Sequence, residues 1–220
     1  NSVMIFRHHF TAAAGPATLE IAADSYYELY CNGRLLPGTQ LADLPGEKSV
    51  TAYDVTLQDG RNTLAVRIYY LGASTAGYVR GRAGMLLTVS RNGRTVTQSG
   101  PGWQALPDPA WHQGLEIRVS HQIGFCFEYD ARCEIAWSDP ELDDRAWPQA
   151  MAVPAPEYCY FRRPVPVLEE VPAPEVTLAR QGLLQSSPGA ENFAEMAAND
   201  FMLPVLREAM FVGGKRFAFT

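Results

Sequence analysis

Two Asn-Gly dipeptides constrain the fold most strongly, because each lies between two short runs that read as β-strands. Asn32-Gly33 follows Tyr26–Cys31, and Asn92-Gly93 follows Leu86–Ser90. Asn-Gly supplies the two positive-φ residues of a type I′ turn, whose twist matches that of paired antiparallel strands. The sequence therefore predicts two β-hairpins.

The rest of the chain continues this strand-and-turn pattern. Its 220 residues include 18 Gly and 16 Pro, which separate many short apolar runs. Such a composition favours a β protein over a helical one, and the length suits one domain with a substantial core plus a fragment of a second. We therefore expect a mainly β fold, with a β-sandwich over residues 1–168.

The last quarter differs in composition. Residues 169–174 are acidic and contain proline, as is typical of a linker. Residues 189–202 carry the one predicted helix, because their apolar side chains recur at spacings of three and four. Residues 216–220 read as a strand that has just begun. We expect residues 169–220 to be a linker and the truncated start of a second domain.

Charge and cysteine usage exclude several classes of partner. The net charge of −6 gives no basic footprint, which argues against nucleic acid or an anionic membrane surface. No apolar run reaches the ~20 residues needed to span a bilayer. The first residues lack the form of a secretion signal, and the localisation stays open. The four cysteines have no metal-binding spacing and are expected to be buried free thiols: Cys31, Cys126, Cys133 and Cys159.

The most distinctive chemistry lies in residues 69–83, a glycine-punctuated loop between two predicted strands. Loops fixed on a rigid sheet commonly carry binding function, so we expect Tyr78, Arg80 and Arg82 to face solvent. Arginine and tyrosine are also enriched where domains dock. Contact with a ligand and contact with a neighbouring domain are both open interpretations of this cluster.

Several short motifs follow one another in order along roughly the first three quarters of the chain. They are Ala23-Asp-Ser-Tyr26, Tyr30-Cys-Asn-Gly33, Tyr53-Asp-Val-Thr56, Asp59-Gly-Arg-Asn-Thr-Leu-Ala-Val66, Leu71-Gly-Ala-Ser-Thr75, Tyr78-Val-Arg-Gly-Arg82, Gly102-Trp103, Gly124-Phe125, Glu128-Tyr-Asp-Ala-Arg132 and Asp143-Asp-Arg-Ala-Trp147. Together and in this order, these motifs resemble the N-terminal region of bacterial α-L-rhamnosidases, which are large inverting glycoside hydrolases.

This resemblance implies a galactose-binding-like jelly roll that lies beside a separate catalytic α-helical barrel. No such barrel fits in this chain, so we expect a non-catalytic accessory domain whose partner is the catalytic domain of the same polypeptide. Accessory sandwiches of the family sometimes bind sugar and sometimes calcium. No run of oxygen ligands suggests calcium here, and no cofactor is expected. An autonomous carbohydrate-binding module that recognises rhamnose-containing glycans, or a purely structural spacer, are the alternatives.

The acidic residues are better explained by structure than by catalysis. Asp143 and Asp144 are adjacent and should point apart, whereas an inverting pair must face each other across a sugar. Glu128 and Asp130 are expected to share one face of a strand with Arg132, which would form a salt bridge with them. His8 and His9 should alternate across a strand, one at the surface and one in the core.

Two tryptophans are candidates for sugar contact, because sugars pack against aromatic faces flanked by hydrogen-bonding groups. The alternative is that Trp103 fills the core and Trp111 covers an edge of the sandwich, since large aromatic side chains usually supply buried area. We retain Trp111, with Tyr78, Arg80 and Arg82, as candidates for carbohydrate or interdomain contact.

Overall fold

A computed structural model describes residues 1–38, 43, 46–114, 118–120, 124–125, 127–154, 157–166, 177, 184–187, 209–212 and 215–219. The chain divides into two compact units, Asn1–Glu170 and Val171–Thr220. The position of this division is close to the predicted boundary at residue 168, which stays a prediction. The first unit is the β-sandwich that contains all the candidate residues.

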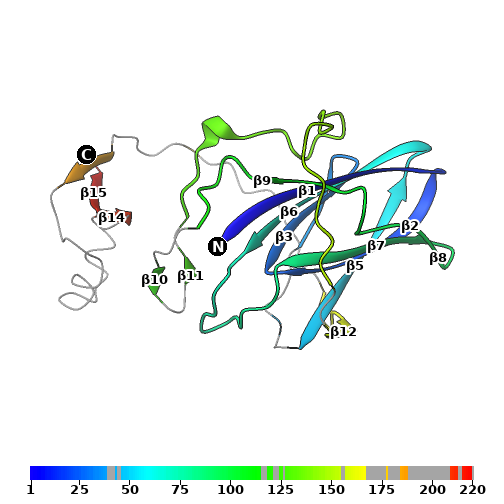
Figure 1. Cartoon of the computed structure of the whole chain (residues 1–220), viewed down its shortest axis with the longest axis horizontal. Coiled ribbons are helices and arrows are strands. Elements are labelled where there is room, and N and C mark those ends of the chain that lie inside the picture. Colours follow the sequence, from blue (N-terminus) through cyan, green and yellow to red (C-terminus); the bar gives the residue numbers. More distant parts are fainter. Residues whose placement is uncertain are drawn as a thin grey trace. The chain divides into compact units, whose positions relative to one another are not determined.

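The sandwich consists of two five-stranded sheets (Figure 1). We call them sheet A, in the order β4-β3-β6-β1-β9, and sheet B, in the order β12-β5-β2-β7-β8. The predicted mainly β class and β-sandwich are therefore confirmed. The strands of sheet A are β1 (Ser2–Ala12), β3 (Tyr26–Cys31), β4 (Arg34–Leu36), β6 (Gly60–Tyr70) and β9 (Gln104–Pro107); those of sheet B are β2 (Gly15–Asp24), β5 (Glu47–Leu57), β7 (Gly84–Arg91), β8 (Arg94–Gln98) and β12 (Cys159–Arg162).

Both predicted hairpins are present. Asn32 and Gly33 join β3 to β4 with φ values of 50° and 75°, and Asn92 and Gly93 join β7 to β8 with φ values of 50° and 72°. These left-handed values are those that a type I′ turn requires of its two central residues. The hairpins fix the register of the strands on either side of them.

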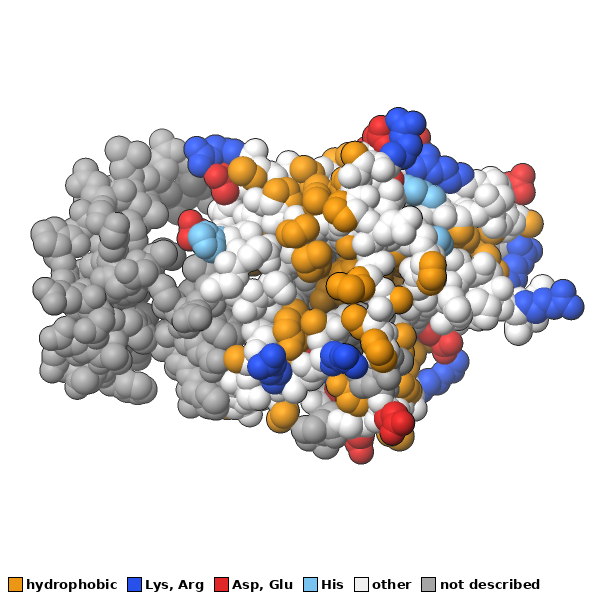
Figure 2. Space-filling view, in the orientation of Figure 1, with side chains coloured by type: hydrophobic (Ala, Val, Ile, Leu, Met, Phe, Trp, Pro, Cys, Tyr) orange, Lys and Arg blue, Asp and Glu red, His pale blue; other side chains and the backbone are white. Residues whose placement is uncertain are grey.

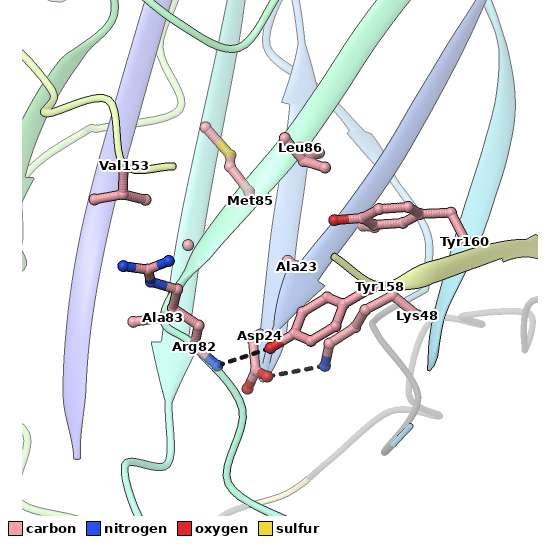
Figure 3. Close-up of a pocket in the computed structure, with 12 residues that line it drawn as sticks. Ala23, Asp24, Lys48, Arg82, Ala83, Met85, Leu86, Val153, Tyr158 and Tyr160 are labelled. Atoms are coloured by element: carbon pink, nitrogen blue, oxygen red, sulfur yellow. Dashed lines mark hydrogen bonds and ion pairs between the residues drawn. The ribbon is translucent and has the colours of Figure 1, made fainter. Parts of the chain in front are cut away.

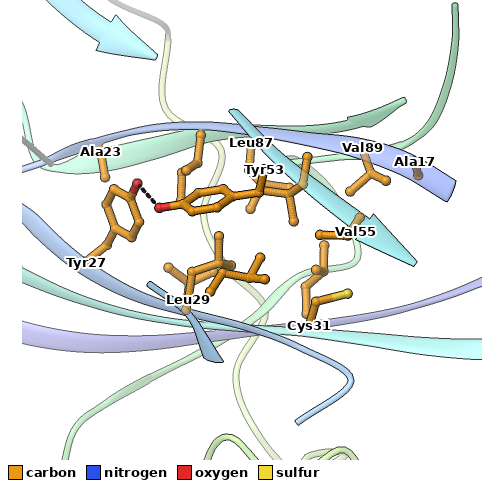
Figure 4. Packing of buried hydrophobic residues seen from close by; sticks show 14 of the residues in the cluster. Ala17, Ala23, Tyr27, Leu29, Cys31, Tyr53, Val55, Leu87 and Val89 are labelled. Atoms are coloured by element: carbon orange, nitrogen blue, oxygen red, sulfur yellow. Dashed lines mark hydrogen bonds between the residues drawn. The ribbon is translucent and has the colours of Figure 1, made fainter. Parts of the chain in front are cut away.

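The core lies between the two sheets (Figure 4). Alternate residues of each strand point inward, so Leu29 and Val66 of sheet A meet Leu19 and Val55 of sheet B. Trp103 is 1% exposed and joins this core, which confirms the structural interpretation of that residue. The one polar contact drawn in the cluster joins the hydroxyls of Tyr27 and Tyr53 at 2.9 Å.

A smaller cluster covers part of the outer face of sheet A. Ile5 and Ala65 are buried there by Trp137, which comes from the irregular segment 127–147. This segment contains the short 3₁₀ turn η1 (Ala131–Cys133). Residues 138–148 of the segment form turns and bends without a helix.

Further pairings extend the strands of the first unit. β12 pairs in parallel with β5 at the edge of sheet B. β9 pairs with β1, because β1 still offers backbone hydrogen bonds on that side. β10 (Arg118–Ser120) pairs with β11 (Gly124–Phe125) in a separate two-stranded sheet, and Phe127 beyond them is 67% exposed.

The cysteines also differ from expectation. Cys31 is a buried free thiol, and burial raises its pKa to about 11, against a small lowering by the charge of Arg34. Cys133 and Cys159 are free but exposed, because they lie on a surface turn and on an edge strand. Cys126 lies outside the described residues.

The second unit has three described strands, β13 (Leu184–Ser187), β14 (Ala209–Val212) and β15 (Lys215–Phe219). They form one antiparallel sheet with β15 in the centre, so the strand predicted at the end of the chain is present. The predicted helix over residues 189–202 lies outside the described residues. No helix in the described part of the chain is long and apolar enough to cross a bilayer.

Candidate functional site

The loop between β6 and β7 is an ordered turn. Thr75 and Tyr78 form an antiparallel bridge, in which the Thr75 amide donates to the Tyr78 carbonyl at 2.8 Å. The Arg80 amide donates to Ser74 Oγ at 3.0 Å. These local bonds set the directions in which Tyr78 and Arg80 point.

Tyr78 points into the sandwich. It is 4% exposed, and its hydroxyl donates a short hydrogen bond to Asp24 Oδ1 and accepts one from the Gly81 amide at 3.1 Å. Burial, followed by the hydrogen bond to Asp24, raises the pKa of Tyr78 to about 12, so the hydroxyl keeps its proton. The expectation that Tyr78 faces solvent was wrong, because the sequence does not show that the end of β2 lies beneath the loop.

Asp24 has further partners besides Tyr78, and its ion pair with Lys48 is drawn in Figure 3. Its Oδ2 accepts from Lys48 Nζ at 2.8 Å, and its Oδ1 accepts from Ser25 Oγ at 2.9 Å. Asp24 is 2% exposed and Lys48 is 8% exposed, so the pair is buried. A buried carboxylate must be paired and hydrogen-bonded to be tolerated, and both conditions hold for Asp24.

A small hollow lies above this ion pair. Its walls include Arg82, Met85, Val153, Tyr158 and Tyr160, and its volume is about 70 Å³. Sites for small organic ligands usually measure about 300–1,000 Å³. The hollow therefore has room for a few water molecules and is too small for a sugar ring.

The two arginines of the loop remain at the surface. The Arg82 amide donates to Tyr158 Oη at 3.4 Å, and Arg82 Nη1 donates to the Pro154 carbonyl at 3.0 Å. Arg82 thus ties the loop to the segment that leads into β12. Arg80 contacts only its own loop and strand in the bonds described, through Tyr70 Oη at 3.4 Å. Its guanidinium is exposed and can reach a partner.

Trp111 lines a different hollow, on the outer face of sheet A. Its ring packs 6.3 Å from Tyr69, 5.4 Å from Phe127 and 5.3 Å from Tyr129 between centroids. Tyr69 and Tyr70 are adjacent on β6 and point to opposite faces, so one contacts Trp111 and the other contacts the loop. The structure does not bring the four candidate residues into one site.

The hollow beside Trp111 has a volume of about 500 Å³, and we call it the aromatic groove. Sequence reasoning missed its other main residues, which come from β3 and β6: Tyr26, Glu28, Tyr30, Arg67 and Tyr69. The signal was available in Tyr26–Cys31, where a hairpin strand places aromatic and acidic residues at every second position. Residues at that spacing line one face of a sheet.

The carboxylates considered as acid and base are held by basic partners. Asp144 is 2% exposed and accepts from Arg7 Nε at 2.7 Å, whereas Asp143 is exposed and pairs with Arg145. The two adjacent residues point apart as expected. Asp130 pairs with Arg132 at 2.7 Å as predicted, but Glu128 lies 3.8 Å from His112 instead of joining them.

The two histidines of β1 are both partly buried, so the expected split into one surface and one core residue was wrong. His8 stacks on Trp103 at 5.0 Å, and His9 contacts Asp144 Oδ2 at 2.9 Å. Burial is the main cause that lowers the pKa of each. Among the described residues, no group of three or more His, Cys, Asp or Glu side chains could hold a metal ion.

Comparison with solved structures finds the same fold in α-L-rhamnosidases. A GH78 family rhamnosidase of Bacillus sp. GL1 matches 76% of this chain with 33% identity and a TM-score of 0.69. The predicted resemblance is confirmed. The Streptomyces avermitilis α-L-rhamnosidase, solved with L-rhamnose, matches 67% of the chain with 29% identity and a TM-score of 0.50.

The α-L-rhamnosidase of Aspergillus terreus shares the fold over 71% of the chain, with 22% identity and a TM-score of 0.51. The rhamnosidase-like chain spans only 19%, 16% and 20% of the lengths of these three proteins. It therefore corresponds to one part of such a polypeptide. No family model matches the chain, and no curated protein matches it.

Proposed function

We propose that the rhamnosidase-like chain is a non-catalytic accessory β-sandwich of an α-L-rhamnosidase, which hydrolyses terminal L-rhamnose from glycosides. In this proposal the catalytic domain belongs to the same polypeptide, and the sandwich supports it. The similarity to one fifth of the Bacillus enzyme is consistent with such a role.

The pairing of the buried carboxylates is the observation that carries this proposal. In the part of the chain that the structure describes, three acidic residues are buried, and each accepts from a basic group: Asp24 from Lys48, Asp108 from Arg67 and Asp144 from Arg7. An inverting glycosidase needs one protonated carboxyl and one carboxylate on opposite sides of the sugar, free to exchange protons with it. Side chains locked in buried ion pairs do not meet that requirement.

An exposed apolar surface supports contact with a neighbouring domain. Leu86, Met151 and Val153 line a groove of about 490 Å³ and are 41%, 85% and 50% exposed. Hydrophobic side chains also gather across the middle of the face seen in Figure 2. Large exposed apolar patches usually mark sites of protein contact, because leaving them in water is unfavourable.

The test is hydrolysis of an aryl α-L-rhamnoside by the purified 220-residue chain. We expect no release of the aryl alcohol above the rate in buffer. Release that disappears in a matched Asp24→Asn or Asp144→Asn variant would contradict the proposal. A contaminating host enzyme is recognised because its activity is the same in preparations of wild type and of both variants.

A second candidate function is an autonomous carbohydrate-binding module. The aromatic groove favours it, because exposed aromatic rings beside charged side chains suit sugar recognition. This function is compatible with the accessory role, since one domain can both bind a glycan and support a catalytic neighbour.

A further inference from the structure

The strand register places an aromatic pair beside a charged pair in the aromatic groove. Tyr26 of β3 lies directly opposite Tyr69 of β6, and Glu28 lies opposite Arg67. Side chains directly opposite on one face of an antiparallel pair are close enough to interact. The groove therefore offers an aromatic wall and a hydrogen-bonding edge next to each other.

The aromatic wall consists of three aromatic rings. Tyr26 and Tyr69 stack with centroids 6.3 Å apart and an angle of 21° between their planes. The Trp111 ring lies beside this pair, with its centroid 6.3 Å from that of Tyr69 and its plane tilted by 41°. Tyr26 is 38% exposed, so part of the wall is open to a ligand.

The hydrogen-bonding edge is held rigidly. Arg67 Nη2 donates to Glu28 Oε1 at 2.6 Å, and Nη1 donates to Asp108 Oδ2 at 3.4 Å. The guanidinium also lies 5.1 Å from the ring of Trp137. Three contacts hold Arg67, and Arg67 in turn anchors the Glu28 carboxylate, whose side chain is 47% exposed.

The charges of this edge favour a neutral ligand. One arginine faces two carboxylates, so the described residues of the groove offer no unopposed cation to an anion. Burial acts to lower the pKa of Arg67, but the hydrogen bond and charge of Glu28, with those of Asp108, outweigh it and raise the pKa. The arginine therefore stays charged and paired.

A pyranose matches these features, because it has a C–H face that packs on an aromatic ring and hydroxyl groups that bond to carboxylate and guanidinium. The volume of about 500 Å³ also lies within the usual range for small-molecule sites. We propose that the aromatic groove binds a neutral pyranose, namely a terminal L-rhamnose or a similar sugar. This inference rests on the proposed function, which supplies the class of glycan.

The test is isothermal titration calorimetry of the 220-residue protein with L-rhamnose, D-galactose and, as a non-pyranose control, glycerol. We expect saturable heat with at least one of the two sugars and none with glycerol. Tyr26→Ala and Trp111→Ala should each weaken the affinity at least tenfold. Tyr26 is the cleaner variant because its ring is already partly in solvent.

The matched control is Tyr160→Ala. Tyr160 is 39% exposed, almost the same as Tyr26, but it lies on β12 at the small hollow above Asp24. This variant should keep the wild-type affinity. Two results would overturn the proposal: no saturable heat with either sugar, or a loss of affinity in Tyr160→Ala while Tyr26→Ala binds normally.

The two proposals fail in different ways. Hydrolysis of an aryl rhamnoside by the chain would contradict the accessory role and leave binding in the groove standing. A titration without saturable heat for either sugar would contradict sugar binding in the groove and would leave the accessory role standing.

Discussion

Removing the Tyr78 hydroxyl tests whether the loop between β6 and β7 is pinned to the sandwich by Asp24. Tyr78→Phe keeps the ring, which is 4% exposed, and deletes only the group that donates to Asp24 Oδ1 and accepts from the Gly81 amide. A hydrogen bond to a charged group contributes about 1.5–3 kcal/mol, and an amide left without a partner adds to the loss. We expect the free energy of unfolding to fall by about 2 kcal/mol.

Urea denaturation of the 220-residue chain measures this change as a shift of the midpoint at constant slope. In thermal unfolding the same loss should lower Tm by about 4 to 8 °C for a domain of this size. Tyr160→Phe is the control. Because Tyr160 is 39% exposed, the loss of its hydroxyl should change the free energy of unfolding by less than about 0.5 kcal/mol. If Tyr78→Phe is as stable as this control, the hydrogen bond from Tyr78 to Asp24 does not hold the loop, and our account of the loop fails.

The pH dependence gives a second test of the same contact. The folded-state pKa of Tyr78 is raised from 10.0 to about 12, mainly by burial and then by the bond to Asp24. The stability linked to this group is fully present below the unfolded pKa of 10.0 and is lost as the pH rises towards about 12. Tyr78→Phe should therefore lose less stability than wild type over this alkaline range.

Three further predictions concern the same unit. Gly81→Ala should destabilise the sandwich by about 1 kcal/mol or more, measured by urea denaturation, because a Cβ there would lie 2.0 Å from Asp24 Oδ2, which Lys48 holds in place; unchanged stability would mean that the loop shifts freely. Asp144→Ala should lower the free energy of unfolding by about 3–5 kcal/mol, since it leaves the fully buried Arg7 without its carboxylate. The control is the neighbouring Asp143→Ala, which removes only an exposed ion pair and should leave Tm unchanged. Thermal stability should fall as the pH drops below 6.5, because burial lowers the pKa of His8 and His9 in the folded state and unfolding lets them take up protons; a Tm that stays flat between about pH 8 and about pH 5 would contradict this.

Local sequence signals predicted the sheets well, because their causes are local. Asn32-Gly33 and Asn92-Gly93 determine two hairpins through their own backbone preferences, and alternation identifies the strands around them. Trp103 could be placed in the core because a large aromatic side chain most often supplies buried area. None of these inferences needs knowledge of distant residues.

The candidate site was harder to predict, because its geometry depends on partners far away in the sequence. Tyr78 is buried by Asp24, which lies 54 residues earlier, and Trp111 joins a groove built by β3 and β6. A loop rich in Tyr and Arg has the same composition whether its tyrosine points outward or is pinned inward. The resemblance to rhamnosidases predicted the fold correctly, and it did not contain the information needed to find the aromatic groove.

The accessory role and sugar binding in the aromatic groove are compatible in one sandwich. Its described buried carboxylates are held in ion pairs, and its partly exposed aromatic residues are available for contact with a ligand. Arg80 is the exposed loop arginine whose described bonds stay within its own loop and strand, whereas Tyr78 and Arg82 hold the loop in place. The loop is therefore fixed by Tyr78 and Arg82 and presents the exposed guanidinium of Arg80 for a contact.

Hydrolysis of an aryl α-L-rhamnoside by the purified chain tests the central claim most directly. Our account predicts a rate equal to that in buffer. Asp24, Asp108 and Asp144 are each paired with a buried or partly buried lysine or arginine, so they are not free to exchange protons with a sugar. Turnover that copurifies with the wild-type chain and is abolished by Asp24→Asn or Asp144→Asn would contradict it.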